Sequence, residues 1–146
     1  MNPTTTTARS IDANFSTSAR QMLEALDSQF PPIYERRKIA RHRFEAVATF
    51  TVESVAGRPV CLVEPQAQVL VRDANSWALG YITNVHIASH AKGRVTMTGP
   101  DGQTFESGCL VRRTREFAPG WFQGVLEFDL QQQLFSEEAL ATAKAA

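Results

Sequence analysis

Short apolar segments separated by turn signals run through most of this sequence and constrain its fold more than any other feature. The first segment has a period of two, with one apolar face made of Phe44, Ala46, Ala48, Phe50 and Val52. Glutamate and threonine side chains occupy the other face, and a period of two is typical of a half-buried β-strand. Turn-forming residues follow at 55–59. This pattern predicts that the chain becomes an antiparallel sheet from residue 44 onward.

The same logic predicts further strands along the chain, at residues 59–63, 66–72, 77–87, 94–97, 104–107, 109–115 and 122–130. Many short strands with turns between them are typical of an antiparallel barrel or sandwich. A closed barrel also removes exposed strand edges. The sequence therefore predicts a mainly β fold.

Helical signals lie at both ends of this series. Residues 1–15 are rich in polar side chains without a period and predict a mobile tail. Residues 16–32 predict a helix, which Ser16 or Thr17 caps and the Pro31–Pro32 pair ends. Its apolar face consists of Ala19, Met22, Leu23, Leu26 and Phe30. A helix this short is marginal alone, so we expect it to pack on the barrel or on a second copy of the chain. Residues 33–146 then form the barrel domain, which ends in a short helix capped by Ser136.

Composition restricts the functional classes. The 146 residues carry 15 Lys and Arg and 15 Asp and Glu, for a formal net charge of zero. A dedicated nucleic-acid-binding domain is usually basic, so nucleic acid is not the expected partner. There is no secretory signal and no apolar run of membrane-spanning length, so we expect a cytoplasmic protein without membrane insertion. Cys61 and Cys109 lie in apolar runs and are expected to be buried thiols.

A dense basic block precedes the first strand, with Arg36, Arg37, Lys38, Arg41 and Arg43 close together. The guanidinium group is planar, always charged and presents paired donors. Those donors match phosphate oxygens and the O6/N7 edge of guanine. One interpretation is a segment that wraps an anionic, guanine-bearing ligand. The other is a set of solvated ion pairs with Glu35 and Glu45, each of which contributes little.

The Arg37-x-x-x-Arg41 spacing directly before a barrel strand resembles the signature of the PilZ domain. Residues 109–130 are similar to the closing strands of that family, with an aromatic-Gly-Val-x-Phe-like end. The resemblance extends over roughly residues 35 to 135. It implies a small antiparallel six-stranded β-barrel that binds the bacterial second messenger cyclic di-GMP.

The second motif of the family is Asp/Asn-x-Ser-x-x-Gly at the end of a strand, and its candidate here is residues 84–89. Asn84 matches the first position, whereas His86 replaces the serine and Ser89 replaces the glycine. The resemblance implies a ligand site formed by Arg36, Arg37, Arg41, Asn84, His86 and Ser89. His86 and His90 are four residues apart at a strand end and lack partner ligands, so no metal is expected.

The resemblance implies a non-enzymatic receptor or adaptor for bacterial second-messenger signalling, which binds cyclic di-GMP and acts on a protein partner. The sequence shows no nucleophile–base pair, phosphate loop or catalytic carboxylate pair, so neither catalysis nor a cofactor is expected. The alternative is a degenerate PilZ-like module that binds no nucleotide and works as a protein-interaction scaffold. The intact arginine pair favours the first hypothesis, and the altered second motif favours the second.

Overall fold

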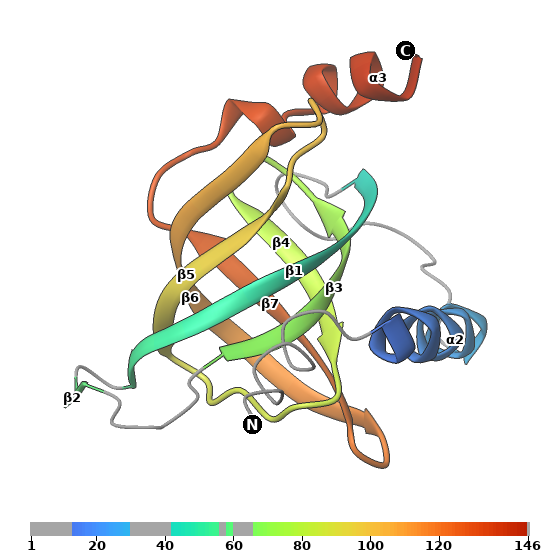
Figure 1. Cartoon of the computed structure of the whole chain (residues 1–146), viewed down its shortest axis with the longest axis vertical. Helices are drawn as coiled ribbons and strands as arrows, with labels where there is room; N and C mark the ends of the chain where they lie inside the picture. The colour runs from blue at the N-terminus through green and yellow to red at the C-terminus, as the bar shows by residue number, and fades with distance from the viewer. Residues whose placement is uncertain (1–12, 30–41, 56–57, 60–65, 146) are drawn as a thin grey trace, which may run out of the picture.

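The computed structural model describes residues 13–29, 42–55, 58–59 and 66–145. Figure 1 shows a β-barrel with helix α2 (Ala13–Gln29) along one side and helix α3 (Glu137–Ala145) near one end. The strands are β1 (His42–Val55), β2 (Arg58–Pro59), β3 (Gln66–Ala74), β4 (Ala78–Thr83), β5 (Ala91–Thr98), β6 (Thr104–Ala118) and β7 (Trp121–Phe128). A single 3-10 turn, η1 (Gln133–Phe135), leads into α3.

Six of these strands close into a barrel. Their order around the sheet is β1-β3-β4-β7-β6-β5, and β1 pairs again with β5. All pairs are antiparallel, and β2 adds only two residues beside the end of β1. Closure gives each of the six strands a partner on both sides, which removes the edges at which sheets aggregate. The predicted six-stranded antiparallel barrel with an N-terminal helix and a short C-terminal helix is confirmed.

Inward-pointing side chains at alternate strand positions fill the barrel. The largest that are fully buried inside it are Phe50, Val69, Val71, Leu79, Tyr81, Val95, Val111 and Leu126. Phe135 of η1 is also fully buried and packs against Phe105 and Phe128, so it closes the barrel beside α3. Ser136 Oγ accepts a hydrogen bond of 3.2 Å from the backbone N–H of Ala139, which is the predicted cap of α3.

Helix α2 covers an apolar patch on the outside of the barrel. Leu70 and Ile82 are register partners on β3 and β4, and their side chains belong to the cluster under the helix rather than to the barrel interior. Against them the helix buries a stripe at three- and four-residue spacing, made of Phe15, Ala19, Leu23 and Leu26. The apolar face of the helix therefore packs on the barrel of its own chain, one of the two arrangements that its sequence predicts.

The helix starts earlier than the sequence predicts, at Ala13. The reason is Phe15, whose ring stacks on Trp121 with centroids 6.1 Å apart and extends the buried stripe by one turn. Ser16 therefore lies inside the helix and accepts a hydrogen bond from Arg20, so its predicted capping role is wrong. The predicted end at Pro32 and the predicted tail over residues 1–12 lie outside the described residues.

Several strand boundaries also differ from the prediction, most clearly those of β6 and β4. β6 runs unbroken from Thr104 to Ala118, because its first part pairs with β5 and its second part pairs with β7. β4 ends at Thr83, whose hydroxyl donates 2.7 Å to the carbonyl of Gln68 and accepts from the N–H of Val85. Residues 84–87 therefore lie in a loop. The strand predicted at residues 59–63 falls outside the described residues beyond Pro59.

Candidate functional site

The arginine-rich segment joins the barrel at the end that carries α3. Arg36, Arg37 and Arg41 lie outside the described residues, so their roles stay predictions. The described chain resumes at His42, the residue after Arg41. Its Nε2 atom lies 3.9 Å from Oε1 of Glu137 in α3.

A hollow of about 340 Å³ opens on the outer face of the barrel nearby. Four strands, β3, β4, β6 and β7, supply its lining of Arg72, Asp73, Gly80, Tyr81, Arg113, Arg115, Gln123, Gly124 and Val125. β1 lies next to it, because Arg43 is the register partner of Asp73. The volume falls at the lower end of the range of small-molecule sites, about 300 to 1,000 Å³.

Two of the residues that line the hollow are glycines. Gly80 stands two residues before Ile82 on β4, and a Cβ atom at Gly80 would overlap with the carboxylate of Asp73. Gly124 lies across the strand pair from Tyr81, and a Cβ atom there would overlap with the backbone carbonyl of Arg113. Both glycines allow a neighbour to approach closely, and any other residue there would force that neighbour to move. The hollow thus begins on β4 just beyond the apolar patch that α2 covers.

The arginines around the hollow differ in their ion pairs. Arg72 is mostly buried and donates 3.0 Å to Asp27 of α2, with Asp73 at 3.7 Å. Arg113 and Arg115 are exposed and form no ion pair with any carboxylate of the described residues. Arg112, their neighbour on β6, lies outside the lining and pairs with Glu127 at 3.7 Å. The described part of the hollow therefore presents two guanidinium groups whose donors face solvent.

Tyr81 lies beneath the hollow, inside the barrel wall. Burial raises the pKa of Tyr81 to about 12, and the neighbouring hydroxyl of Thr114 opposes this rise. Both hydroxyl groups are buried, and neither reaches hydrogen-bond geometry with a partner among the described residues. A buried polar atom without a partner lowers the stability of a fold.

Asn84, His86 and Ser89 lie in the loop between β4 and β5, at the barrel end opposite α3 (Figure 1). All three are exposed, and the His86 ring packs edge-on against Phe122 with centroids 5.3 Å apart. Thr83, just before the loop, donates a hydrogen bond to Gln68 of β3. Gln68 is in turn the register partner of Thr49 on β1. Along β1, Thr49 is on the order of 20 Å from His42. The structure therefore does not bring these three residues to the point where the arginine-rich segment joins β1.

A better-placed match to the second motif was missed in the sequence, at residues 75–80. Asn75 and Gly80 occupy the first and last motif positions, with Trp77 in place of the serine. The segment directly follows β3 and reaches the hollow through Gly80. Asn75 Oδ1 accepts hydrogen bonds from the N–H groups of Trp77 (2.7 Å) and Ala78 (2.9 Å), so this side chain shapes the turn. The family motif follows the end of a strand, and the predicted strand at residues 66–72 ends shortly before Asn75. This position was the sequence signal for the alternative.

Other site types find little support in the described part of the chain. There, no three His, Cys, Asp or Glu side chains are placed to hold a metal ion. Within the same residues, no helix combines the length and hydrophobicity that crossing a membrane requires. Cys109 is a buried thiol, as predicted, and burial raises its pKa to about 12. Cys61 lies outside the described residues.

Comparison with known proteins adds evidence on the fold. No protein-family model matches the chain, and no curated protein matches it in sequence. The Bacillus subtilis inhibitor of motility (MotI/DgrA) has a similar structure, with a TM-score of 0.54 and 13% sequence identity. The match covers 79% of this chain and 55% of that chain, so the present chain spans about half the length of its neighbour. At this identity the likeness shows the fold, which is the PilZ-like barrel that the sequence predicts.

Proposed function

We propose that the chain is a non-enzymatic PilZ-like adaptor that binds cyclic di-GMP on the outer face of its barrel and acts on a protein partner. The observation that carries this proposal is the hollow beside the start of β1, with Arg113 and Arg115 exposed on its lining. Arg37 and Arg41 immediately precede that strand in the sequence. Guanidinium groups bind both chemical parts of the ligand, its phosphates and its guanine edges.

The size of the hollow suits part of such a ligand. A volume of about 340 Å³ leaves some of a cyclic dinucleotide outside. In this proposal, Arg37 and Arg41 hold the outer part, while Arg113 and Arg115 contact the part inside. Nothing in this division of roles requires a reaction, because a guanidinium group binds charge or a base edge without chemical change.

The alternative is a PilZ-like scaffold that binds no nucleotide, and the 84–89 loop favours it. Asn84 and His86 are separated from the hollow along β4 by Ile82, which α2 covers. In this alternative, the altered motif residues of the loop contribute nothing to a ligand in the hollow. The two hypotheses differ in a single measurable property, the affinity for cyclic di-GMP.

Calorimetric titration of the full chain with cyclic di-GMP tests the proposal. We expect Arg113→Ala and Arg115→Ala each to weaken binding by about 1 to 3 kcal/mol, the scale of hydrogen bonds to charged groups. Arg37→Ala and Arg41→Ala should have effects of the same size. The matched control is Arg112→Ala, which removes the same charge from the same strand outside the hollow. Absence of binding by the wild-type chain would contradict the proposal and favour the scaffold.

A further inference from the structure

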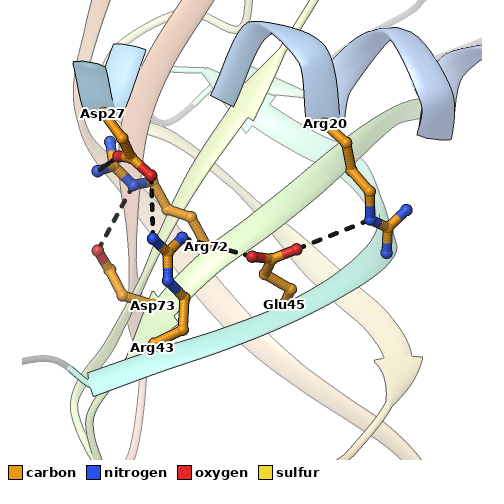
Figure 2. Close-up of polar contacts among 6 residues, drawn as sticks. All are labelled: Arg20, Asp27, Arg43, Glu45, Arg72 and Asp73. Carbon is orange, nitrogen blue, oxygen red and sulfur yellow. Dashed lines mark hydrogen bonds and ion pairs between the residues drawn. The ribbon is translucent and has the colours of Figure 1, made fainter. Parts of the chain in front are cut away.

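One carboxylate joins helix α2 to two strands of the barrel. Asp27 lies in the last part of α2, and its two oxygens bind different arginines (Figure 2). Oδ2 accepts 2.9 Å from Arg43 of β1, and Oδ1 accepts 3.0 Å from Arg72 of β3. Only 29% of the Asp27 side chain is exposed, so these are not loose surface pairs. The hydrogen bond to Asp27 is the main reason that the pKa of Arg43 is raised above its usual value.

Arg72 belongs both to this cluster and to the hollow. Its guanidinium group therefore lies within reach of any anion bound there. Phosphate and carboxylate oxygens accept from guanidinium in the same way. Asp27 accepts from Nη2 of that group at 3.0 Å, whereas Asp73 lies farther away, 3.7 Å from its Nε atom. A phosphate in the hollow and the Asp27 carboxylate would therefore be like charges competing for the same donors.

The remainder of α2 is held by apolar contacts and by an ion pair between Arg20 and Glu45 of β1, whose Nε and Oε1 atoms lie 3.7 Å apart (Figure 2). Leu23 and Leu26 pack on Leu70 and Ile82, and Phe15 at the far end stacks on Trp121. These apolar contacts do not depend on the charge of the hollow. Loss of the Asp27 contacts would therefore release only the C-terminal turn of the helix, whose amide groups already fray most easily.

We propose that Asp27 is an internal competitor for the anion that binds the hollow, and that it couples ligand binding to the C-terminal turn of α2. A phosphate-bearing ligand that takes Arg72 displaces the Asp27 carboxylate and loosens this turn. Coupling is reciprocal, so removal of the Asp27 charge strengthens anion binding. The ligand class rests on the proposed function, but the competition itself requires only an anion in the hollow.

The test compares Asp27→Asn with Glu24→Gln in the full chain. Both substitutions remove one negative charge from α2 with little change in shape. Glu24 is exposed on the same helix and, among the described residues, forms no ion pair. The probes are cyclic di-GMP and inorganic pyrophosphate at matched ionic strength. The readouts are the dissociation constant and the hydrogen exchange of backbone amides in residues 26–29.

We expect Asp27→Asn to bind both probes at least about fivefold more tightly than wild type, the low end of measured couplings. Glu24→Gln should bind like wild type. In wild type, either probe should accelerate exchange at the end of α2, whereas in Asp27→Asn exchange should already be fast without a probe. An Asp27→Asn variant that binds neither probe more tightly than Glu24→Gln overturns the inference. Tighter binding of pyrophosphate without any binding of cyclic di-GMP supports the competition and contradicts the proposed ligand.

Discussion

The outer face of β3 and β4 has two halves that differ in chemistry although they lie on the same strands. In the covered half, Leu70 and Ile82 are sealed beneath α2. In the open half, the next outward positions hold Arg72 and Gly80 on the lining of a hollow. One half buries apolar surface and stabilises the fold, whereas the other exposes donors and space.

This difference shows how a small barrel can place an open, polar surface beside a covered apolar one without weakening its core. The alternation of a strand sends every second side chain outward, so the outer face can change character within two residues. Ile82 requires a cover, which α2 provides. Gly80 has no side chain to cover, and Asp27 at the end of the helix joins the two halves through Arg72. The last described turn of the helix therefore contacts a residue of the hollow.

The largest expected effect is a difference in unfolding free energy between a variant of the covered half and a variant of the open half. Ile82→Ala should lower the free energy of unfolding by about 2 to 5 kcal/mol, because it leaves a cavity between α2 and the barrel. Arg113→Ala in the open half should change it by no more than about 0.5 kcal/mol, since this exposed side chain has no ion pair among the described residues. Urea unfolding of both variants measures the contrast. Similar losses in the two variants would show that the open half is also structural.

Much of the covered half could be predicted from sequence, because its signals are local. The alternation of residues 44–52 predicts β1, and the spacing of Ala19, Leu23 and Leu26 predicts the buried face of α2. The start of the helix was missed because Phe15 finds its partner, Trp121, only in the folded chain. Local periodicity carries no information about such a distant contact.

The open half could not be predicted, because it depends on the register of four strands. Arg72, Gly80 and Arg113 are far apart in sequence and meet only through the pairing of β3, β4, β7 and β6. The same limit explains the candidate second motif. Residues 84–89 were chosen by residue type, whereas the register places them at the barrel end away from His42. The two ion pairs of Asp27 could not be predicted either, because its arginine partners are 16 and 45 residues away in the sequence.

A smaller effect is expected from closing the hollow. Gly80→Ala places a Cβ atom against the carboxylate of Asp73, and such overpacking typically costs about 1 to 3 kcal/mol. The variant should also bind cyclic di-GMP more weakly, because the added methyl group fills the lining. Combining it with Asp73→Ala provides the control, since the carboxylate is then absent. Stability losses that simply add in the double variant would show that the contact with Asp73 is not the cause.

The smallest effect at neutral pH concerns Tyr81, which lies on the inner side of the wall beneath the open half. Tyr81→Phe should leave stability nearly unchanged or slightly higher at pH 7, because the buried hydroxyl that it removes has no hydrogen-bond partner among the described residues. The alkaline range should distinguish the two proteins. The pKa of Tyr81 is raised from 10.0 to about 12, so the fold favours the neutral phenol.

For a raised pKa, the stabilisation is complete below the unfolded value and is lost as the pH rises through the folded value. The wild-type chain should therefore lose stability between about pH 10 and pH 12 by up to about 1.4 kcal/mol per unit of pKa shift. Tyr81→Phe should not show the loss of stability that comes from Tyr81. It should still lose the stability that comes from Cys109, whose pKa is also raised to about 12. The sequence contains two tyrosines, so the ultraviolet absorbance of tyrosinate can follow Tyr81 against Tyr34 alone. A single transition near the ordinary tyrosine value in the folded wild-type chain would show that Tyr81 is hydrated, and the hollow would then extend through the barrel wall to the phenol.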